Sequence, residues 1–486
     1  MRRRFEQQLK IGQIPISETE INPDSQNTLD QLLAALKEIF CNEEYNEKIF
    51  NILETELLQT NSKNGRPGMD LWAIFVLAQV RLGMNASYNT LHNQANNHHL
   101  LRCILGIEQE TSFGRIEYEY QNIYDNVSLL TDDILHKIND IIVDFAHKKV
   151  FSKKKEEIPL RLKSDSFVVE SNVHFPTDYN LLWDCVRVCL LLTDKLLKRH
   201  PTITGWRKIK SWRADLKAQM REVGRKSTSG GKNKEKLLKE VTQKYVTKST
   251  LLYFKLNELM SCIPLNEIKD LELLLSLEYF LGFLKKHIDL VERRIIKGEK
   301  IPHEEKMFSI FETYTEWITK GKLRPNIELG KKVAITTDQW GLILDWKIMD
   351  NEQDRDIVIE LSDRLLKKFF ITSWSFDKGF WNATNRELLK LYVKDVIMPK
   401  LGKLSEKDME LENSRIFKHL KNKHSAVESN INELEHRGVD RCPDRGEGHF
   451  KSYIGLGVCA YNLKKIGKAI LKSQQEFAEK SRKKAA

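Results

Sequence analysis

The sequence predicts an α/β protein in which a mixed β-sheet core is interrupted by a large helical insertion and preceded by helices alone. Three observations lead to this prediction. Apolar residues follow a helical period through most of residues 1–150. Alternating and β-branched residues then appear in two separate segments, "PLRLKSDSFVVE" and "KKVAITTDQWGLILDWKIMD". After Asp178, between these segments, the pattern returns to helical periodicity for about 145 residues.

The N-terminal region, residues 1–150, is predicted to be a helical domain. "QNTLDQLLAALKEIF" has apolar residues at i, i+3 and i+4, and "DLWAIFVLAQVRLGM" follows the helix-start signal "GRPGMD". "ASYNTLHNQANNHHLLRCILGI" could form a helix-turn-helix whose second helix reads a DNA groove. Packing between helices explains the same apolar spacing, so both interpretations stay open.

The sheet core is predicted in two parts, residues 151–179 and 329–470, on either side of a helical insertion at 180–328. The first part holds a strand around Lys163–Val169. The insertion contains long amphipathic stretches such as "LLWDCVRVCLLLTDKLLKR". Its segment "GRKSTSGGKNKEK", residues 224–236, is rich in glycine and lysine and has no apolar period, so we expect a mobile basic loop there.

The second part of the core begins with a predicted hairpin whose turn lies near Asp338–Gly341. The helix "DRDIVIELSDRLLKKF" follows, and then a strand that ends in "SWSFDKGFW", where Asp377 precedes Gly379. A further helix, a short strand at "VIMP" and a long helix from about Glu406 to His436 complete the core, and residues 471–486 form a basic tail. With the insertion set aside, this element order is that of a ribonuclease H-like sheet, and fold order alone does not give function.

The composition favours a polyanionic partner. The formal charge is +11, and DNA, RNA or an anionic membrane would each satisfy it. The start "MRRRFEQQLKIGQIPIS" lacks an apolar core of signal-peptide length, and no window reaches the roughly 18 uninterrupted apolar residues of a membrane span. Seven scattered cysteines form neither a disulfide framework nor a zinc pattern. We therefore expect a cytoplasmic protein without a membrane segment.

Two aspartates stand at comparable places on predicted strands, and they are the first candidates for chemistry. Asp165 lies within the first strand and Asp377 ends the fourth. In a sheet of this order those strands can lie side by side, and paired carboxylates suit magnesium, a hard ion that prefers oxygen ligands. Two such ions about 4 Å apart can activate an attacking oxygen and stabilise the leaving oxygen of a phosphodiester. A lone aspartate at a strand end is also a common cap or turn residue, so this site needs a third acid.

The last predicted helix offers that third acid. Its apolar stripe should pack on the sheet and consists of Leu420, His424, Val427, Ile431 and Leu434. Glu428 lies at the edge of this stripe, Glu435 continues the same edge, and Glu433 falls on the opposite flank. The spacing is also that of acids on the solvent side of a packed helix, so it does not select one residue.

A basic segment within the insertion, "GWRKIKSWRADLKAQMREVGRK", interleaves Trp206 and Trp212 with cations. This pattern suits phosphate contacts and base stacking on nucleic acid. A solvated amphipathic helix would look the same. The candidate phosphate-binding residues are Arg207, Lys208, Lys210 and Arg213.

Several blocks of the chain resemble bacterial insertion-sequence transposases of the DDE class. "SDSFVVESNVHFPTDYNLLWD" is similar to the first-aspartate block of that family, and "SFDKGFW" resembles the second. "HSAVESNINELEHRGVDRCPDRGEGHFKSYIGLGVCAYNL" resembles the glutamate block. "GRPGMDLWAIFVLAQVRLGMNASYNTLHNQANNHHLLRCILGI" and "KMFSIFETYTEWITKGK" are similar to an N-terminal domain and to a subgroup block. The five blocks span roughly residues 10–465 and occur in family order.

The resemblance implies a recombinase that binds the inverted repeats at the ends of its own element and cuts and joins DNA strands with two Mg²⁺ ions, for which Mn²⁺ could substitute. It implies Asp165, Asp377 and Glu428 as the metal-binding triad, and residues 1–150 as a domain for DNA binding and dimerisation. Partners would be double-stranded repeat ends and target DNA, on which the chain would act as a homodimer or higher oligomer in the bacterial cytoplasm, at the nucleoid. Catalytically inactive DNA-binding descendants and ribonuclease H-like nucleases without strand transfer are the alternatives.

Two positions depart from the pattern of many relatives. Those relatives carry an arginine four residues before the glutamate and a lysine seven residues after it, and here these positions hold His424 and Glu435. The nearest later cation is Arg437, which becomes the candidate for holding a phosphate. The insertion also comes early, between the first and second strands.

Overall fold

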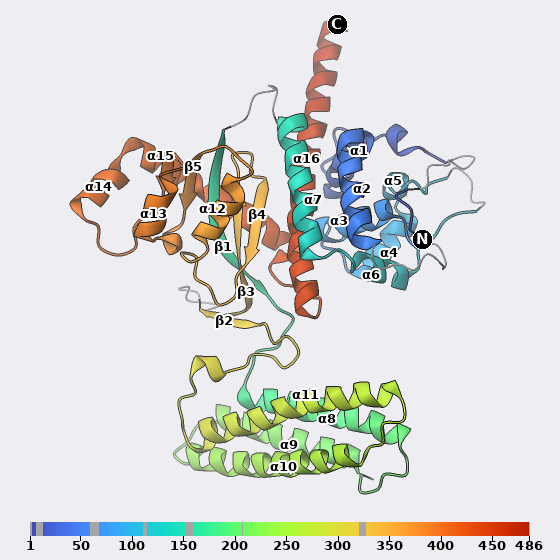
Figure 1. Ribbon diagram of the computed structural model, residues 1–486, viewed down its shortest axis with the longest axis vertical. Helices are drawn as coiled ribbons and strands as arrows, with labels where there is room; N and C mark the ends of the chain where they lie inside the picture. Colours follow the sequence, from blue (N-terminus) through green and yellow to red (C-terminus); the bar gives the residue numbers. More distant parts are fainter. Residues whose placement is uncertain are drawn as a thin grey trace. The chain divides into compact units, whose positions relative to one another are not determined.

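The structure is a computed structural model, which describes residues 2–5, 13–58, 68–109, 114–151, 159–206, 208–319 and 327–485 (Figure 1). The chain divides into two compact units. One comprises Met1–Asn172 together with Ile318–Ala486, and the other is Val173–Trp317. None of the helices in the described ranges is long and apolar enough to cross a membrane.

A mixed six-stranded sheet forms the centre of the first unit. Its order is β2-β3-β1-β5-β6, with β4 paired to β3. Strand β1 is antiparallel to β3 and parallel to β5, β3 is antiparallel to β4, and β5 is parallel to β6. The strands are β1 Leu160–Glu170, β2 Glu316–Thr319, β3 Ile327–Thr337, β4 Ile343–Ile348, β5 Ile371–Phe376 and β6 Asp395–Ile397. The predicted mixed α/β class and the predicted first and fourth strands are therefore confirmed.

The predicted hairpin is also present, and its turn is fixed by the buried carboxylate of Asp338. This carboxylate accepts hydrogen bonds from the backbone N–H groups of Trp340 and Leu342 at 2.8 and 2.9 Å. Its other oxygen lies 2.7 Å from Nε2 of His147. Gly341 has φ +76°, a conformation that few residues other than glycine adopt easily. The turn therefore forms where "DQWG" predicts it.

The N-terminal helices belong to the same unit as the sheet, although the sequence pattern sets them apart as a domain. Helix α3 is buried along its whole length, which its uninterrupted apolar run requires. Residues Leu101 to Ile104 of α5 are all buried, which favours packing between helices over a DNA-reading helix for this segment. The helices are α1 Thr28–Cys41, α2 Glu43–Leu57, α3 Leu71–Gly83, α4 Tyr88–Asn97, α5 His99–Ile104, α6 Tyr120–Val127 and α7 Asp132–Phe145.

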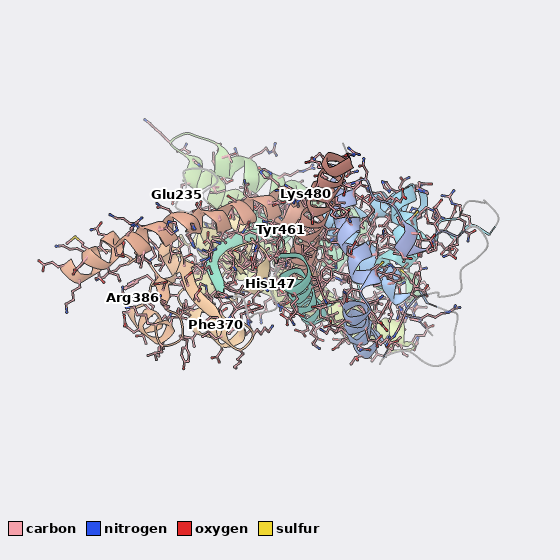
Figure 2. All side chains as sticks on the ribbon, turned by 90° about the horizontal axis from the view of Figure 1, so that it is seen from above. His147, Glu235, Phe370, Arg386, Tyr461 and Lys480 are labelled. Atoms are coloured by element: carbon pink, nitrogen blue, oxygen red, sulfur yellow. The ribbon has the colours of Figure 1, made fainter. Side chains whose placement is uncertain are left out.

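A long C-terminal helix, α16 Glu447–Ala485, joins these helices to the sheet. A Cβ atom at Gly467 would lie 1.6 Å from the carbonyl oxygen of Gln31, so only glycine allows α16 to approach α1 this closely. Tyr461, near the middle of α16 in Figure 2, places its hydroxyl 3.2 Å from the carbonyl oxygen of Gly341 in the hairpin turn. The expected tail 471–486 is the end of this helix, and its side chains become exposed beyond Leu471, as at Phe477.

Four shorter helices accompany the sheet: α12 Val358–Leu366, α13 Ala383–Leu389, α14 Glu406–Asn413 and α15 Arg415–Leu434. The single helix expected from about Glu406 to His436 is wrong, because Ser414 interrupts it. Ser414 has extended backbone angles, φ −59° and ψ 148°, and its side chain accepts a hydrogen bond from the N–H of Phe417. It is therefore the N-cap of a new helix, a role that serine fills well.

The unit Val173–Trp317 contains four long helices, as the predicted helical insertion requires: α8 Asp178–Arg199, α9 Ile209–Thr228, α10 Lys234–Cys262 and α11 Ile268–Val291. The mobile loop expected over residues 224–236 is wrong for most of that range. Helix α9 continues to Thr228 and α10 starts at Lys234, so only residues 229–233 connect them. The hydroxyls of Ser227 and Thr228 donate hydrogen bonds to the carbonyl oxygen of Gly224 near the end of α9. These bonds help the helix to continue into a segment whose composition predicts a loop.

Candidate active site

The two candidate aspartates lie at the same level of two paired strands. In the parallel register of β1 and β5, Ser164 is the Cα partner of Phe376. Asp165 is the next residue of β1, and Asp377 directly follows the last residue of β5. The structure therefore brings together two acids that are far apart in the sequence, as the predicted strand order requires. Asp377 is exposed, whereas Asp165 is only partly accessible.

Helix α15 brings Glu428 to this edge of the sheet. Its buried face packs on β1, β5 and β6 through the predicted stripe, of which His424, Val427, Ile431 and Leu434 are buried. Nδ1 of His424 lies 3.0 Å from Oγ of Ser375, two residues before Asp377. Glu428 follows His424 by one helical turn, on the exposed edge of the helix. The hydrogen bond from His424 to Ser375 thus fixes which turn of α15 meets the end of β5.

The pKa of Asp165 shows that the acids lie close enough to influence one another electrostatically. The pKa of Asp165 is raised to about 7, chiefly by burial, and the negative charges of Asp377, Asp354 and Glu428 contribute to this rise. A hydrogen bond of 2.7 Å from the N–H of Ser166 opposes this rise. Because desolvation and like charges both penalise a carboxylate, an added cation would stabilise the ionised form here.

Asp354 is an acid of this site that sequence reasoning missed. It lies between β4 and α12, and its Oδ2 is 3.1 Å from Nζ of Lys332. A Cβ atom at Gly379 would lie 2.8 Å from the same oxygen, so the glycine after Asp377 makes room for this carboxylate. Oδ1 of Asp354 is buried and has no hydrogen-bond partner among the described atoms. The acid-rich segment "MDNEQDRD" before the helix was the available signal, but no periodicity marked one of its acids.

The acids supply oxygen ligands of the kind that a hard divalent cation prefers. Carboxylate oxygens are the ligands that Mg²⁺ prefers. Within the described ranges, neither Asp165, Asp377 nor Glu428 forms an ion pair with a lysine, arginine or histidine. In that same part of the chain, no three histidine, cysteine, aspartate or glutamate side chains lie close enough to form a metal-binding group. The acids match magnesium in the chemistry of their ligand atoms and in the repulsion among them, but among the described residues their side chains do not converge into a metal-binding group.

Two cations of this part of the chain, Lys163 and Arg437, are engaged within the protein. Nζ of Lys163, two residues before Asp165 and on the same face of β1, donates to the carbonyl oxygen of Asp338 at 3.0 Å. Arg437 donates through Nη1 to the carbonyl oxygen of Gly83 at 3.2 Å, and its Nε lies 3.5 Å from Oε1 of Glu433. The side chain of Arg437 is only 22% exposed. Its expected role in holding a phosphate would therefore require it to leave these contacts.

His424 is held in its neutral form by the structure. Its pKa is lowered to about 4, chiefly by burial; the negative charge of Asp377 opposes this shift, and the positive charge of Lys163 contributes to it. A neutral imidazole does not supply the fixed positive charge that many relatives place at this position as arginine. His424 is thus an anchor for α15 in this structure.

The predicted basic segment lies in the other unit. Lys208 is the N-cap residue of α9, and Lys210 and Arg213 are exposed on that helix, whereas Arg207 lies outside the described residues. The burial of Trp206 contradicts the expectation that this ring stacks on nucleic acid, whereas Trp212 is only partly buried. Trp206 is 9% exposed and belongs to the apolar core of the helical unit, and Trp212 packs against that core.

Comparisons with known proteins add no identification. No family model, curated protein or solved structure matches this chain.

Proposed function

We propose that the chain is a DNA transposase of the DDE class, which cleaves DNA strands at the ends of its own element and joins them to a target. The observation that carries the proposal is the parallel pairing of β1 with β5, which places Asp165 beside Asp377. The order of the sequence blocks supports the same conclusion, because it assigns these two aspartates and Glu428 to one triad.

Asp165, Asp377 and Glu428 would hold the magnesium ions. Bound there, the ions would activate an attacking oxygen and stabilise the leaving oxygen of a phosphodiester. The chain itself positions the carboxylates. The β-sheet ladder holds Asp165 and the strand that Asp377 directly follows, and the hydrogen bond between His424 and Ser375 would hold the turn of α15 that carries Glu428. Asp354 adds a further carboxylate beside Asp377.

DNA recognition in this proposal is divided between the ends of the element and the target duplex. Working as a homodimer or higher oligomer would allow two ends to be joined to one target. The net charge of +11 supports association with a polyanion.

The proposal is tested with Asp165→Asn and Asp377→Asn in a strand-transfer assay on donor DNA ends taken from the flanks of the coding region. Each substitution keeps the size and hydrogen bonding of the side chain but removes the charge that attracts a divalent cation. Cleavage and joining should each fall by about 10³-fold or more, since a metal ion supplies several kcal/mol of transition-state stabilisation. Duplex binding, and the rise in melting temperature on adding Mg²⁺ to the unsubstituted protein, are the second readouts.

Glu410→Gln is the matched control, because Glu410 is an exposed acid on α14. It should leave cleavage unchanged. Retained cleavage in either aspartate variant would overturn the metal assignment. Cleavage without joining in the unsubstituted protein would instead assign a nuclease, and binding without cleavage would assign an inactive DNA-binding descendant.

A further inference from the structure

The positive charge of this chain is concentrated in the helical unit. Residues 173–317 contain 27 lysines and arginines against 19 aspartates and glutamates, which is +8 of the +11 carried by the whole chain. Within that unit, residues 201–250 alone hold 14 basic residues against four acids. Helix α9 and the start of α10 therefore carry most of the excess charge.

On α9 the exposed cations form a single stripe. They recur at three- and four-residue intervals, which places them along one face of a helix, and they are Lys210, Arg213, Lys217, Arg221 and Arg225. The opposite face of α9 holds the buried residues Leu216 and Val223. At a rise of about 1.5 Å per residue the stripe is roughly 22 Å long. The length corresponds to about six phosphates of one strand of duplex DNA.

The stripe is not neutralised by the protein. In the described part of the chain none of its five cations forms an ion pair; the nearby salt bridges join Lys248 to Asp215 at 2.5 Å and Lys239 to Glu235 at 3.0 Å. The exposed acid of α9, Asp215, is thus already paired. Free surface cations of this density attract a polyanion by releasing its counterions.

The surface between the cations fits a phosphate backbone. Ala214 and Ala218 are exposed on the same face and are small, so a backbone can approach the helix closely. Large apolar side chains, which a membrane-binding helix inserts between headgroups, are missing from this face of α9.

The aromatic residues of the same segment turn inward. Nζ of Lys255 lies 4.8 Å from the ring centre of Trp206 and 5.8 Å from that of Trp212, so both rings are covered from α10. Base stacking, which gives proteins their affinity for single strands, is therefore absent from the exposed face of α9.

We infer that α9 binds the backbone of duplex DNA without reading its sequence, through the stripe Lys210, Arg213, Lys217, Arg221 and Arg225. This inference rests on the proposed function for the choice of DNA as the polyanion. It assigns target or flanking DNA to the helical unit, because phosphate contacts fix position but carry no sequence information. Recognition of the element's ends must then come from other residues.

The test uses the full chain and measures binding of two fluorescent 30-base-pair duplexes of unrelated sequence. In the variant Lys217→Gln, Arg221→Gln, Arg225→Gln, three exposed charges are removed with a residue that favours helices. Affinity for both duplexes should fall about 10- to 100-fold at 0.1 M salt, and the slope of log affinity against log salt should become shallower by about 2.7, or 0.9 for each lost contact.

The matched control is Lys285→Gln, Lys286→Gln, Lys300→Gln, which removes the same charge from exposed sites elsewhere in the helical unit. It should change affinity less than about threefold, because its charges lie outside the stripe and are screened by salt. Equal losses in the two triple variants would overturn the inference, since they would show a net-charge effect.

Three further probes separate the alternatives. A single strand of the same length should bind no tighter than the duplex, and tighter binding would overturn duplex specificity. Preferential binding to a duplex RNA, or to vesicles containing anionic lipid, would overturn the choice of DNA. Loss of binding in the α9 variant together with normal cleavage in Asp165→Asn would refute the proposed function and leave the stripe as a DNA-binding surface.

Discussion

The acid site and the α9 stripe distribute charge in opposite ways. At the β1–β5 edge of the sheet, acids gather at a partly buried place, where burial first and the neighbouring acids second raise the pKa of Asp165 to about 7. On α9, five exposed cations lie along one face, and none of them forms an ion pair in the described part of the chain. At the acid site, burial makes each negative charge energetically costly. On α9, each exposed cation contributes little binding energy by itself, and the contributions of several cations add up. The first arrangement suits tight binding of small cations, and the second suits salt-dependent binding of a long polyanion.

The largest expected effect separates two glutamates near the acid site. Glu428→Gln should abolish strand cleavage and transfer with Mg²⁺, since it removes a proposed metal ligand. Glu435→Gln should leave most activity, because a rise of about 1.5 Å per residue places the two positions roughly 10 Å apart. Both variants are measured side by side on one donor-end substrate. The reverse ranking would show that the helix register of the site is wrong by two turns.

The second effect is a dependence of stability on pH that belongs to the acid site alone. Asp165 has a pKa of about 7 in the folded protein, compared with an ordinary value of 3.8. The folded state therefore binds more protons between these values, so the free energy of unfolding falls as pH rises from about 4 to 7. Asp165→Asn should remove this loss, so the stability of the metal-free variant relative to the metal-free unsubstituted protein should rise by up to about 4 kcal/mol between pH 4 and pH 8.

Urea unfolding at the two pH values, with and without Mg²⁺, measures this effect. Added Mg²⁺ should recover part of the lost stability in the unsubstituted protein and none in Asp165→Asn. An identical pH profile in both proteins would show that Asp165 ionises normally. The α9 triple variant is the comparison, and it should keep the original pH profile.

A smaller effect concerns the contact between Gly379 and Asp354. Gly379→Ala would place a Cβ atom 2.8 Å from Oδ2 of Asp354, so the carboxylate must shift. We expect a loss of about 1–3 kcal/mol in the free energy of unfolding, as for other overpacked sites. The double variant with Asp354→Ala should recover most of it, and a thermodynamic cycle gives the coupling. Additive losses would mean that the two residues do not meet.

The smallest effect is expected at Trp212. Trp212→Phe should cost about 1 kcal/mol of stability or less, since the ring is only partly buried against the core of the helical unit. Duplex affinity should stay within about twofold, because α9 contacts DNA through its phosphates alone. A tenfold loss of affinity at unchanged stability would restore the stacking interpretation for this ring.

Predictions were correct where they depended on local residue spacing, and wrong where they depended on which segment packs against a face. Alternation located β1 and β5, and "DQWG" located the hairpin turn, because these signals are local. Trp206 and Trp212 share their segment with cations, yet helical packing turns both rings inward. A periodic pattern does not show which partner covers a face when that partner, here α10, lies later in the chain.

The sequence by itself determined β1, the β3–β4 hairpin, β5, the long helices of the insertion and the positions of Asp165 and Asp377 near paired strands, since backbone period and side-chain chemistry are local properties. Strand β2 was missed, because it lies within the segment predicted to be helical. Tertiary structure alone decided that Asp354 joins these acids, that Arg437 is engaged by Gly83 and Glu433, and that α16 unites the N-terminal helices with the sheet. Each of these outcomes depends on contacts between segments far apart in sequence. Such contacts depend on the packing of the whole unit, which short-range periodicity in the sequence does not show.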